Sequence, residues 1–174
     1  MKNNKEKIRY MTTAGIFAAL ITIMTAYLFH IPVGLNGGYL HFGDMLIYLC
    51  ATMLPTPYAA AAAAIGGGLA DLFTAPMWAP ATVIIKALLA VPFTNKSGKI
   101  ICKRNVAAAI LGFVTTGVGY YFAEKILFGG YVAFVASVTG SLVQSGGSFV
   151  LFLIVGTVLD RVHFRAKAGF LYCR

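Results

Sequence analysis

The sequence predicts an all-α integral membrane protein, a bundle of six helices with both termini in the cytoplasm. Of its 174 residues, 59% are hydrophobic and 11% are charged, whereas a soluble domain has about 25% charged residues. The apolar residues fall into six stretches, and twelve of the fourteen Lys and Arg residues lie in three clusters outside them. These clusters are Lys2, Lys5, Lys7 and Arg9; Lys96, Lys99, Lys103 and Arg104; and Arg161, Arg165, Lys167 and Arg174.

Residues 1–174 are predicted to form a single transmembrane domain. The first predicted span has about twenty residues, enough to cross a hydrocarbon core of ~30 Å, and no cleavage site is obvious after it. We therefore interpret it as a span and not as a signal peptide. The second span is short because Pro55 and Pro57 follow it. The six spans cover residues 10–29, 44–54, 58–74, 79–93, 106–127 and 132–159.

The positions of the basic clusters predict the topology. Four spans separate the first cluster from the second, and two more separate the second from the third. Both numbers are even, so all three clusters lie on one side, and Lys and Arg gather on the cytoplasmic side. The loops at 30–43, 75–78 and 128–131 contain no Lys or Arg. These loops are expected on the outer side of a bacterial plasma membrane, which the multi-pass protein would cross.

Several functions are excluded by what the chain lacks. The net charge of +9 lies beside apolar spans, which favours anionic lipid headgroups over nucleic acid as its partner. The chain has no phosphate-binding loop of an ATPase and no zinc-protease motif. The cysteines Cys50, Cys102 and Cys173 have no metal-binding spacing. We expect no enzyme, no catalytic residue, no cofactor and no metal.

Small residues recur at four-residue spacing in two spans. Ala60, Ala64 and Gly68 share one face of the third span, and Ala14 and Ala18 share one face of the first. Such faces let helix backbones approach closely. The spacing alone favours packing inside the protein, with docking of another membrane protein as the alternative for Ala14 and Ala18.

Asp71 and Lys86 are the strongest candidates for a functional site, because ionisable residues inside a membrane are costly and usually functional. Asp71 follows Gly68 by three residues, so it shares the small face of its span. Lys86 lies on the small, polar side of the fourth span. The two side chains are expected to pair with each other or to contact a ligand, and the sequence leaves both open.

Further ligand candidates lie in the first outer loop and in two later spans. Gln144 shares one face with Ser137, Ser141 and Ser148, and its amide needs several hydrogen-bond partners. Asp44 either caps the second span or contacts ligand. Trp78 is either an interfacial anchor or a stacking residue. The predicted substrate-binding residues are Asn36, Tyr39, His41, Asp44, Asp71, Trp78, Lys86 and Gln144.

Four short motifs in a fixed order carry a family resemblance. They are Gly-Tyr-Leu-His-Phe-Gly-Asp at 38–44, Gly-Gly-Gly-Leu-Ala-Asp at 66–71, Trp-Ala-Pro at 78–80 and Ile-Ile-Lys-Ala at 84–87. With this order, the chain resembles the substrate-binding (S) components of energy-coupling factor (ECF) transporters. The branch it resembles includes the riboflavin, pyridoxine and hydroxymethylpyrimidine S components.

This resemblance implies a subunit that captures a vitamin or cofactor precursor, a small polar heterocycle, from outside. A transmembrane coupling subunit and two cytoplasmic ATPases would then drive uptake. The resemblance also implies that Ala14 and Ala18 dock the coupling subunit, which shifts our prediction for this pair from internal packing to docking. An autonomous proton-coupled carrier and a structural membrane protein without ligand are the alternative functions.

Overall fold

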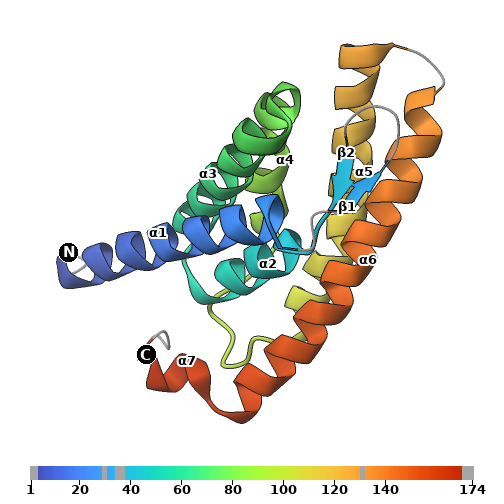
Figure 1. Cartoon of the computed structure of the whole chain (residues 1–174). Coiled ribbons are helices and arrows are strands. Elements are labelled where there is room, and N and C mark those ends of the chain that lie inside the picture. The colour runs from blue at the N-terminus through green and yellow to red at the C-terminus, as the bar shows by residue number, and fades with distance from the viewer. Residues whose placement is uncertain (1–3, 29–30, 34–37, 130–131, 170–174) are drawn as a thin grey trace.

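A computed structural model describes residues 4–28, 31–33, 38–129 and 132–169. In this part of the chain, six helices of eleven residues or more make up the fold (Figure 1). They are α1 (Asn4–Ala26), α2 (Gly43–Met53), α3 (Thr56–Thr74), α4 (Ala79–Ala90), α5 (Lys103–Phe128) and α6 (Val132–Arg161).

The smaller elements connect these helices or follow them. A short antiparallel hairpin, β1 (Ile31–Val33) and β2 (Gly38–Leu40), pairs Ile31 with Leu40 between α1 and α2. The sequence predicts a loop for this segment, so the prediction of an all-α fold holds except for these two strands. A single 3-10 turn, η1 (Pro76–Trp78), precedes α4, and a one-turn helix, α7 (Phe164–Lys167), follows α6.

The protein is a membrane protein, with three helical segments long and apolar enough to cross a bilayer. Among the described residues these are Asn4–Ala26, Lys103–Leu127 and Val143–Arg161. The helices α2 and α4 have 11 and 12 residues, which at ~1.5 Å per residue gives about 16–18 Å. That is shorter than a hydrocarbon core of ~30 Å. Six crossings, the cytoplasmic location of the termini and the single-domain organisation therefore stay predictions.

Proline and glycine set several helix ends. Pro57 lies in the first turn of α3 and Pro80 in the first turn of α4, where the missing N–H has no helical acceptor to lose. At its other end, α5 stops at Gly129, whose φ of 60° is in the left-handed region that glycine adopts at little cost.

Three consecutive glycines let α3 pack closely between α1 and α4. A Cβ atom on Gly66 would lie 2.8 Å from the carbonyl oxygen of Ala18 in α1. A Cβ on Gly68 would lie 2.6 Å from a methyl carbon of Val83 in α4. The hydroxyl of Thr22 also lies 3.0 Å from the carbonyl oxygen of Gly66. The four-residue spacing of small residues therefore serves packing inside the protein at this interface.

The helices α5 and α6 run side by side and form the other part of the molecule, beside the group of α1 to α4 (Figure 1). The two parts meet in a buried aromatic group. The ring of Tyr48 in α2 lies 5.1 Å from that of Phe93 and 5.7 Å from that of Phe152 in α6. All three side chains are buried, so this group is the apolar core that joins α2 to α6.

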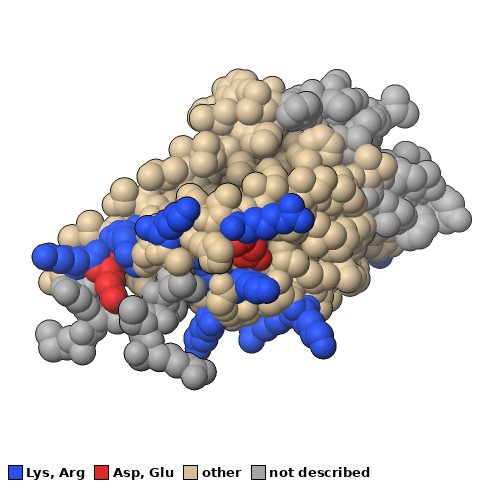
Figure 2. Space-filling model, turned by 90° about the horizontal axis from the view of Figure 1, so that it is seen from below, with Lys and Arg blue, Asp and Glu red and all other residues tan. Residues whose placement is uncertain are grey.

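The described residues of the three basic clusters lie at one end of the molecule. The Asp160 carboxylate accepts hydrogen bonds from the backbone N–H groups of Ile100 and Ile101, at 2.7 and 2.9 Å. The Arg9 guanidinium in α1 donates to the carbonyl oxygen of Gly169, at 2.5 Å. Figure 2 shows Lys and Arg side chains gathered on the face seen from below. The start of α1, the α4–α5 loop and α7 therefore lie near one end of the molecule, and the side of the membrane that they face stays a prediction.

Candidate functional site

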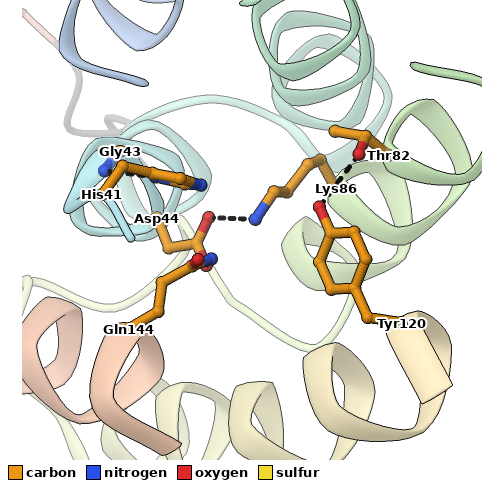
Figure 3. Close-up of polar contacts among 7 residues, drawn as sticks. All are labelled: His41, Gly43, Asp44, Thr82, Lys86, Tyr120 and Gln144. Carbon is orange, nitrogen blue, oxygen red and sulfur yellow. Dashed lines mark hydrogen bonds and ion pairs between the residues drawn. The ribbon is translucent and has the colours of Figure 1, made fainter. Parts of the chain in front are cut away.

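The site begins at Asp44, in the first turn of α2. Its side chain is fully buried, and the residue at the N-cap position of α2 is Phe42, with no side-chain cap hydrogen bond. The capping alternative for Asp44 is therefore wrong. The carboxylate instead faces the interior between α4 and α6 (Figure 3).

Lys86 is the partner of Asp44. Its Nζ atom lies 2.6 Å from Oδ1 of Asp44, and both side chains are almost fully buried. The side chain of Lys86 passes close to Gly67 of α3. A Cβ atom on Gly67 would lie 2.8 Å from the Cγ atom of Lys86. A buried charge pair is retained only with good geometry and further hydrogen bonds. Gly67 therefore provides the space that the lysine side chain needs.

Gln144 completes this group from the opposite side. Its Nε2 atom donates a hydrogen bond of 3.1 Å to Oδ2 of Asp44, so each carboxylate oxygen has its own donor. We call Asp44, Lys86 and Gln144 the charged cluster. It joins α2, α4 and α6, which come from distant parts of the sequence, and its formal charges cancel.

Tyr120 in α5 closes the fourth side of the charged cluster. Its ring centroid lies 5.5 Å from Nζ of Lys86, within the range of a cation–π contact. Its hydroxyl lies 2.9 Å from that of Thr82, one turn before Lys86 in α4. The ring of Trp78 meets that of Tyr120 edge to face, with centroids 6.0 Å apart. Trp78 is buried, so its side chain is directed inward and not toward lipid.

His41 lies beside Asp44 in Figure 3. Its Nδ1 atom accepts a hydrogen bond of 3.0 Å from the backbone N–H of Gly43, which places the proton of a neutral imidazole on Nε2. A Cβ atom on Gly43 would lie 2.1 Å from the Thr25 hydroxyl of α1. The glycine therefore lets the loop before α2 pack against α1 and bring His41 to the site.

The other predicted site residues have different outcomes. Asp71 is buried in α3 and interacts electrostatically with Lys86, but the ion pair of Lys86 is formed with Asp44. Tyr39 lies in β2, and Asn36 falls outside the described residues. Ala18 is buried against α3, and Ala14 is half-buried and packs against the core. Docking of a coupling subunit through these alanines stays a prediction.

Tyr120 and Thr82 are not among the site residues predicted from the sequence, although both contribute to the site. Tyr120 lies in a long apolar helix, and its neighbour Tyr121 gave no reason to prefer either one. A signal was available in the four-residue spacing of Gly112, Thr116 and Tyr120, which places small and polar residues on one helix face. The arrangement offers donors, acceptors and aromatic faces, which suits binding of a polar molecule.

Two comparisons with known proteins are consistent with this geometry. The family model of the ECF-type riboflavin transporter S component matches residues 5–161 of the chain. A protein of Pyrococcus woesei, described as an uncharacterized protein in the gap 3' region, is 30% identical over 146 residues. That match covers 79% of this chain and 98% of the relative. All eight predicted ligand residues lie inside the segment that the family model matches.

Proposed function

The chain belongs to the family of ECF-type riboflavin transporter S components, which are substrate-binding subunits of transporters and not enzymes, and we propose that it binds a vitamin or cofactor precursor at the charged cluster. Asp44, Lys86 and Gln144 would bind the ligand together with His41, Trp78 and Asp71. The predicted residues Asn36 and Tyr39 would contribute from the first loop. The protein would take its ligand from outside a bacterial plasma membrane.

The observation that supports this most strongly is the charged cluster itself. Two opposite charges and an amide are buried between three helices, at 2.6 and 3.1 Å from one another. Buried ion pairs are weak devices for stability, because removal from water costs about as much as the pair gains. A pair inside a membrane protein therefore favours a role in binding. The charges within the charged cluster cancel and Asp71 adds a second buried carboxylate, which disfavours an anionic ligand.

Uptake would depend on partners. The family implies a transmembrane coupling subunit and two cytoplasmic ATPases, and the chain itself has no phosphate-binding loop. Ala14 is the more accessible of the two alanines predicted to dock the coupling subunit. We propose that ligand binding is independent of ATP and that ATP is needed only for release inside.

A titration without ATP tests the proposal. The purified protein is titrated with riboflavin, pyridoxine and 4-amino-5-hydroxymethyl-2-methylpyrimidine, and one of them is expected to bind with a Kd below about 1 μM. Gln144→Met should weaken that ligand at least about tenfold, because it removes one hydrogen-bonding group. Thr157→Val is the matched control on α6, since that hydroxyl bonds only within its own helix.

Two results would contradict the proposal. The first is the absence of any binding tighter than micromolar across the three compounds. The second is uptake into vesicles that is driven by a pH gradient without any ATPase, which would indicate an autonomous carrier. The titration and the uptake assay therefore test binding and coupling separately.

A further inference from the structure

Three buried hydroxyl groups near the charged cluster have no hydrogen-bond partner in the part of the chain that the structure describes. They belong to Tyr48 in α2, Thr116 in α5 and Ser148 in α6, and each side chain is 0% exposed. Neighbouring Ser145 has the same property. Most buried polar groups in proteins are hydrogen-bonded, and each one left unpaired destabilises the fold. Several such groups together, among the described residues, indicate partners that come from outside the chain.

The helix register places Ser148 next to the charged cluster. Gln144 of α6 contacts Asp44 of α2. One turn further along α2 and two turns further along α6, the ring of Phe152 lies 5.7 Å from that of Tyr48. Ser148 is four residues from both Gln144 and Phe152. Residues four apart share a helix face, so Ser148 lies between these two contacts on the side of α6 that faces α2.

The contacts of α5 place Thr116 at about the level of Ser148. A Cβ atom on Gly112 would lie 2.6 Å from the Tyr48 hydroxyl, so that hydroxyl is directed at Gly112. Tyr120 contacts Lys86 and Thr82. Thr116 is four residues from both Gly112 and Tyr120. It therefore lies between the level of the Tyr48 hydroxyl and the level of the charged cluster.

These positions define a second polar level below the charged cluster. We call Tyr48, Thr116 and Ser148 the hydroxyl layer. The stacked and edge-on rings of Tyr48, Phe93 and Phe152, with centroids 5.1 to 6.0 Å apart, lie on the far side of it. The hydroxyl layer is thus bounded by charged groups on one side and by an aromatic floor on the other.

We propose that the hydroxyl layer binds the hydroxyl-bearing, uncharged part of the ligand whose ring contacts the charged cluster. A hydroxyl both donates and accepts, so three unpaired hydroxyls complement an alcohol better than a group that only accepts. The cation at this site, Lys86, is already 2.6 Å from Asp44. A phosphate or carboxylate would therefore be buried without a counter-charge, which is very unfavourable.

This inference rests on the proposed function and narrows its ligand class. The substrate is a neutral heterocycle that carries at least one free hydroxyl, and its phosphate ester is rejected. The ligand hydroxyl would supply hydrogen bonds that these side chains lack among the described residues.

The first test compares each alcohol with its phosphate ester. Riboflavin, pyridoxine and 4-amino-5-hydroxymethyl-2-methylpyrimidine are titrated against the intact protein, each beside its monophosphate. The ester of the compound that binds is expected to be at least about 100-fold weaker. Equal binding of the ester would overturn the hydroxyl layer as a subsite while the proposed function stands. Failure of all three alcohols would instead contradict the proposed function and the subsite together.

The second test separates a binding role from a structural one. Thr116→Val and Ser148→Ala should each weaken the alcohol about tenfold. They should leave the ligand-free protein as stable as before or more stable, because each removes an unpaired buried hydroxyl. Thr115→Val is the matched control, since its hydroxyl bonds to Leu111 of its own helix. A loss of thermal stability with unchanged affinity would overturn the inference.

A ligand without the hydroxyl group completes the test. Lumiflavin, 3-hydroxy-2,4,5-trimethylpyridine and 4-amino-2,5-dimethylpyrimidine keep the ring but lack the alcohol groups of the three probes. Thr116→Val should have no effect on the affinity for the matching deoxy compound, because the lost partner is absent. An equal loss of affinity for the alcohol and for the deoxy compound would show that the variant only disturbs packing.

Discussion

Charged side chains have different partners in two regions of the protein. In the charged cluster, Lys86 and Asp44 pair with each other, and neighbouring hydroxyls have no partner among the described residues. At the basic end, Asp160 accepts from two backbone N–H groups of the α4–α5 loop. Arg165 donates to the carbonyl oxygens of Asn95 and Ser97 in the same loop.

We call Asp160 and Arg165 the C-terminal clamp. Burial lowers the pKa of the Arg165 guanidinium, and the nearby Asp160 carboxylate acts against that shift. Arginine stays protonated in proteins, so the clamp keeps its charge at physiological pH. Both charged side chains of the clamp form hydrogen bonds with backbone N–H and carbonyl groups of the α4–α5 loop. The difference supports our proposal that the charged cluster and the hydroxyl layer bind ligand, whereas the clamp stabilises the fold.

The largest expected effect comes from breaking the buried pair. Lys86→Met leaves the Asp44 carboxylate buried without a counter-charge, so the free energy of unfolding in detergent should fall by about 3–5 kcal/mol. The double variant Lys86→Met with Asp44→Leu should recover most of that stability and still bind no ligand. Lys125→Met, at an exposed position of α5, is the control. A single-variant loss no larger than that of the control would mean that the pair is not buried as described.

The difference between the two regions was only partly predictable from sequence. Lys86 and Asp71 could be chosen because a charge in an apolar span is costly. The partner of Lys86 could not be predicted. The helices that carry Asp44 and Asp71, α2 and α3, both pack against α4, and the spacing of residues in the sequence does not choose between them. Tyr120 and Thr116 were hidden because a hydroxyl in an apolar helix has many structural explanations.

At the basic end, the sequence predicts which residues lie together but not which of them is buried. The sequence placed Arg161, Arg165 and Lys167 together as a positive tail, and their common location with the other basic clusters followed from the even span numbers. Only the structure separates Arg165, which is 3% exposed, from its exposed neighbours. His163 has a left-handed backbone, with φ of 53°, at the point where α7 turns toward the α4–α5 loop. The sequence around it does not predict this turn.

The second prediction addresses the C-terminal clamp. Asp160→Ala removes the acceptor of the Ile100 and Ile101 N–H groups, so the free energy of unfolding should fall by about 1.5–3 kcal/mol. The ligand Kd measured at a temperature where the variant is folded should not change. Weakened binding without a loss of stability would show that the two regions are not separate in function.

A pair of glycines offers a smaller and more closely matched comparison. A Cβ atom on Gly112 would lie 2.6 Å from the Tyr48 hydroxyl, and one on Gly156 would lie 2.6 Å from Ile101 next to the C-terminal clamp. Substitution of either by Ala should cost about 1–3 kcal/mol of stability through overpacking. Only Gly112→Ala should also weaken ligand binding, because it displaces a member of the hydroxyl layer. Isothermal titration and thermal unfolding of the two variants distinguish these outcomes.

Gly117→Ala is the control for that pair. It lies on α5 between Gly112 and Tyr120, and a Cβ atom there would meet nothing within 4 Å. The substitution should raise stability by up to about 1 kcal/mol through helix propensity, without changing the ligand Kd. A loss of binding in this variant would mean that α5 responds to any substitution and that the Gly112 result carries no information on the Tyr48 hydroxyl.

The smallest expected effect tests whether the clamp fixes the loop. Gly98 lies beside Ser97, whose carbonyl accepts from Arg165, and a Cβ atom on Gly98 would meet nothing within 4 Å. Gly98→Ala restricts the unfolded chain, so it should stabilise the protein by about 0.4–1 kcal/mol if the loop is held in one conformation. The gain should disappear in an Asp160→Ala background, where the loop has lost its acceptor. Equal gains in both backgrounds, measured by thermal unfolding, would show that the loop is ordered by its own sequence and that Asp160 only contributes two local hydrogen bonds.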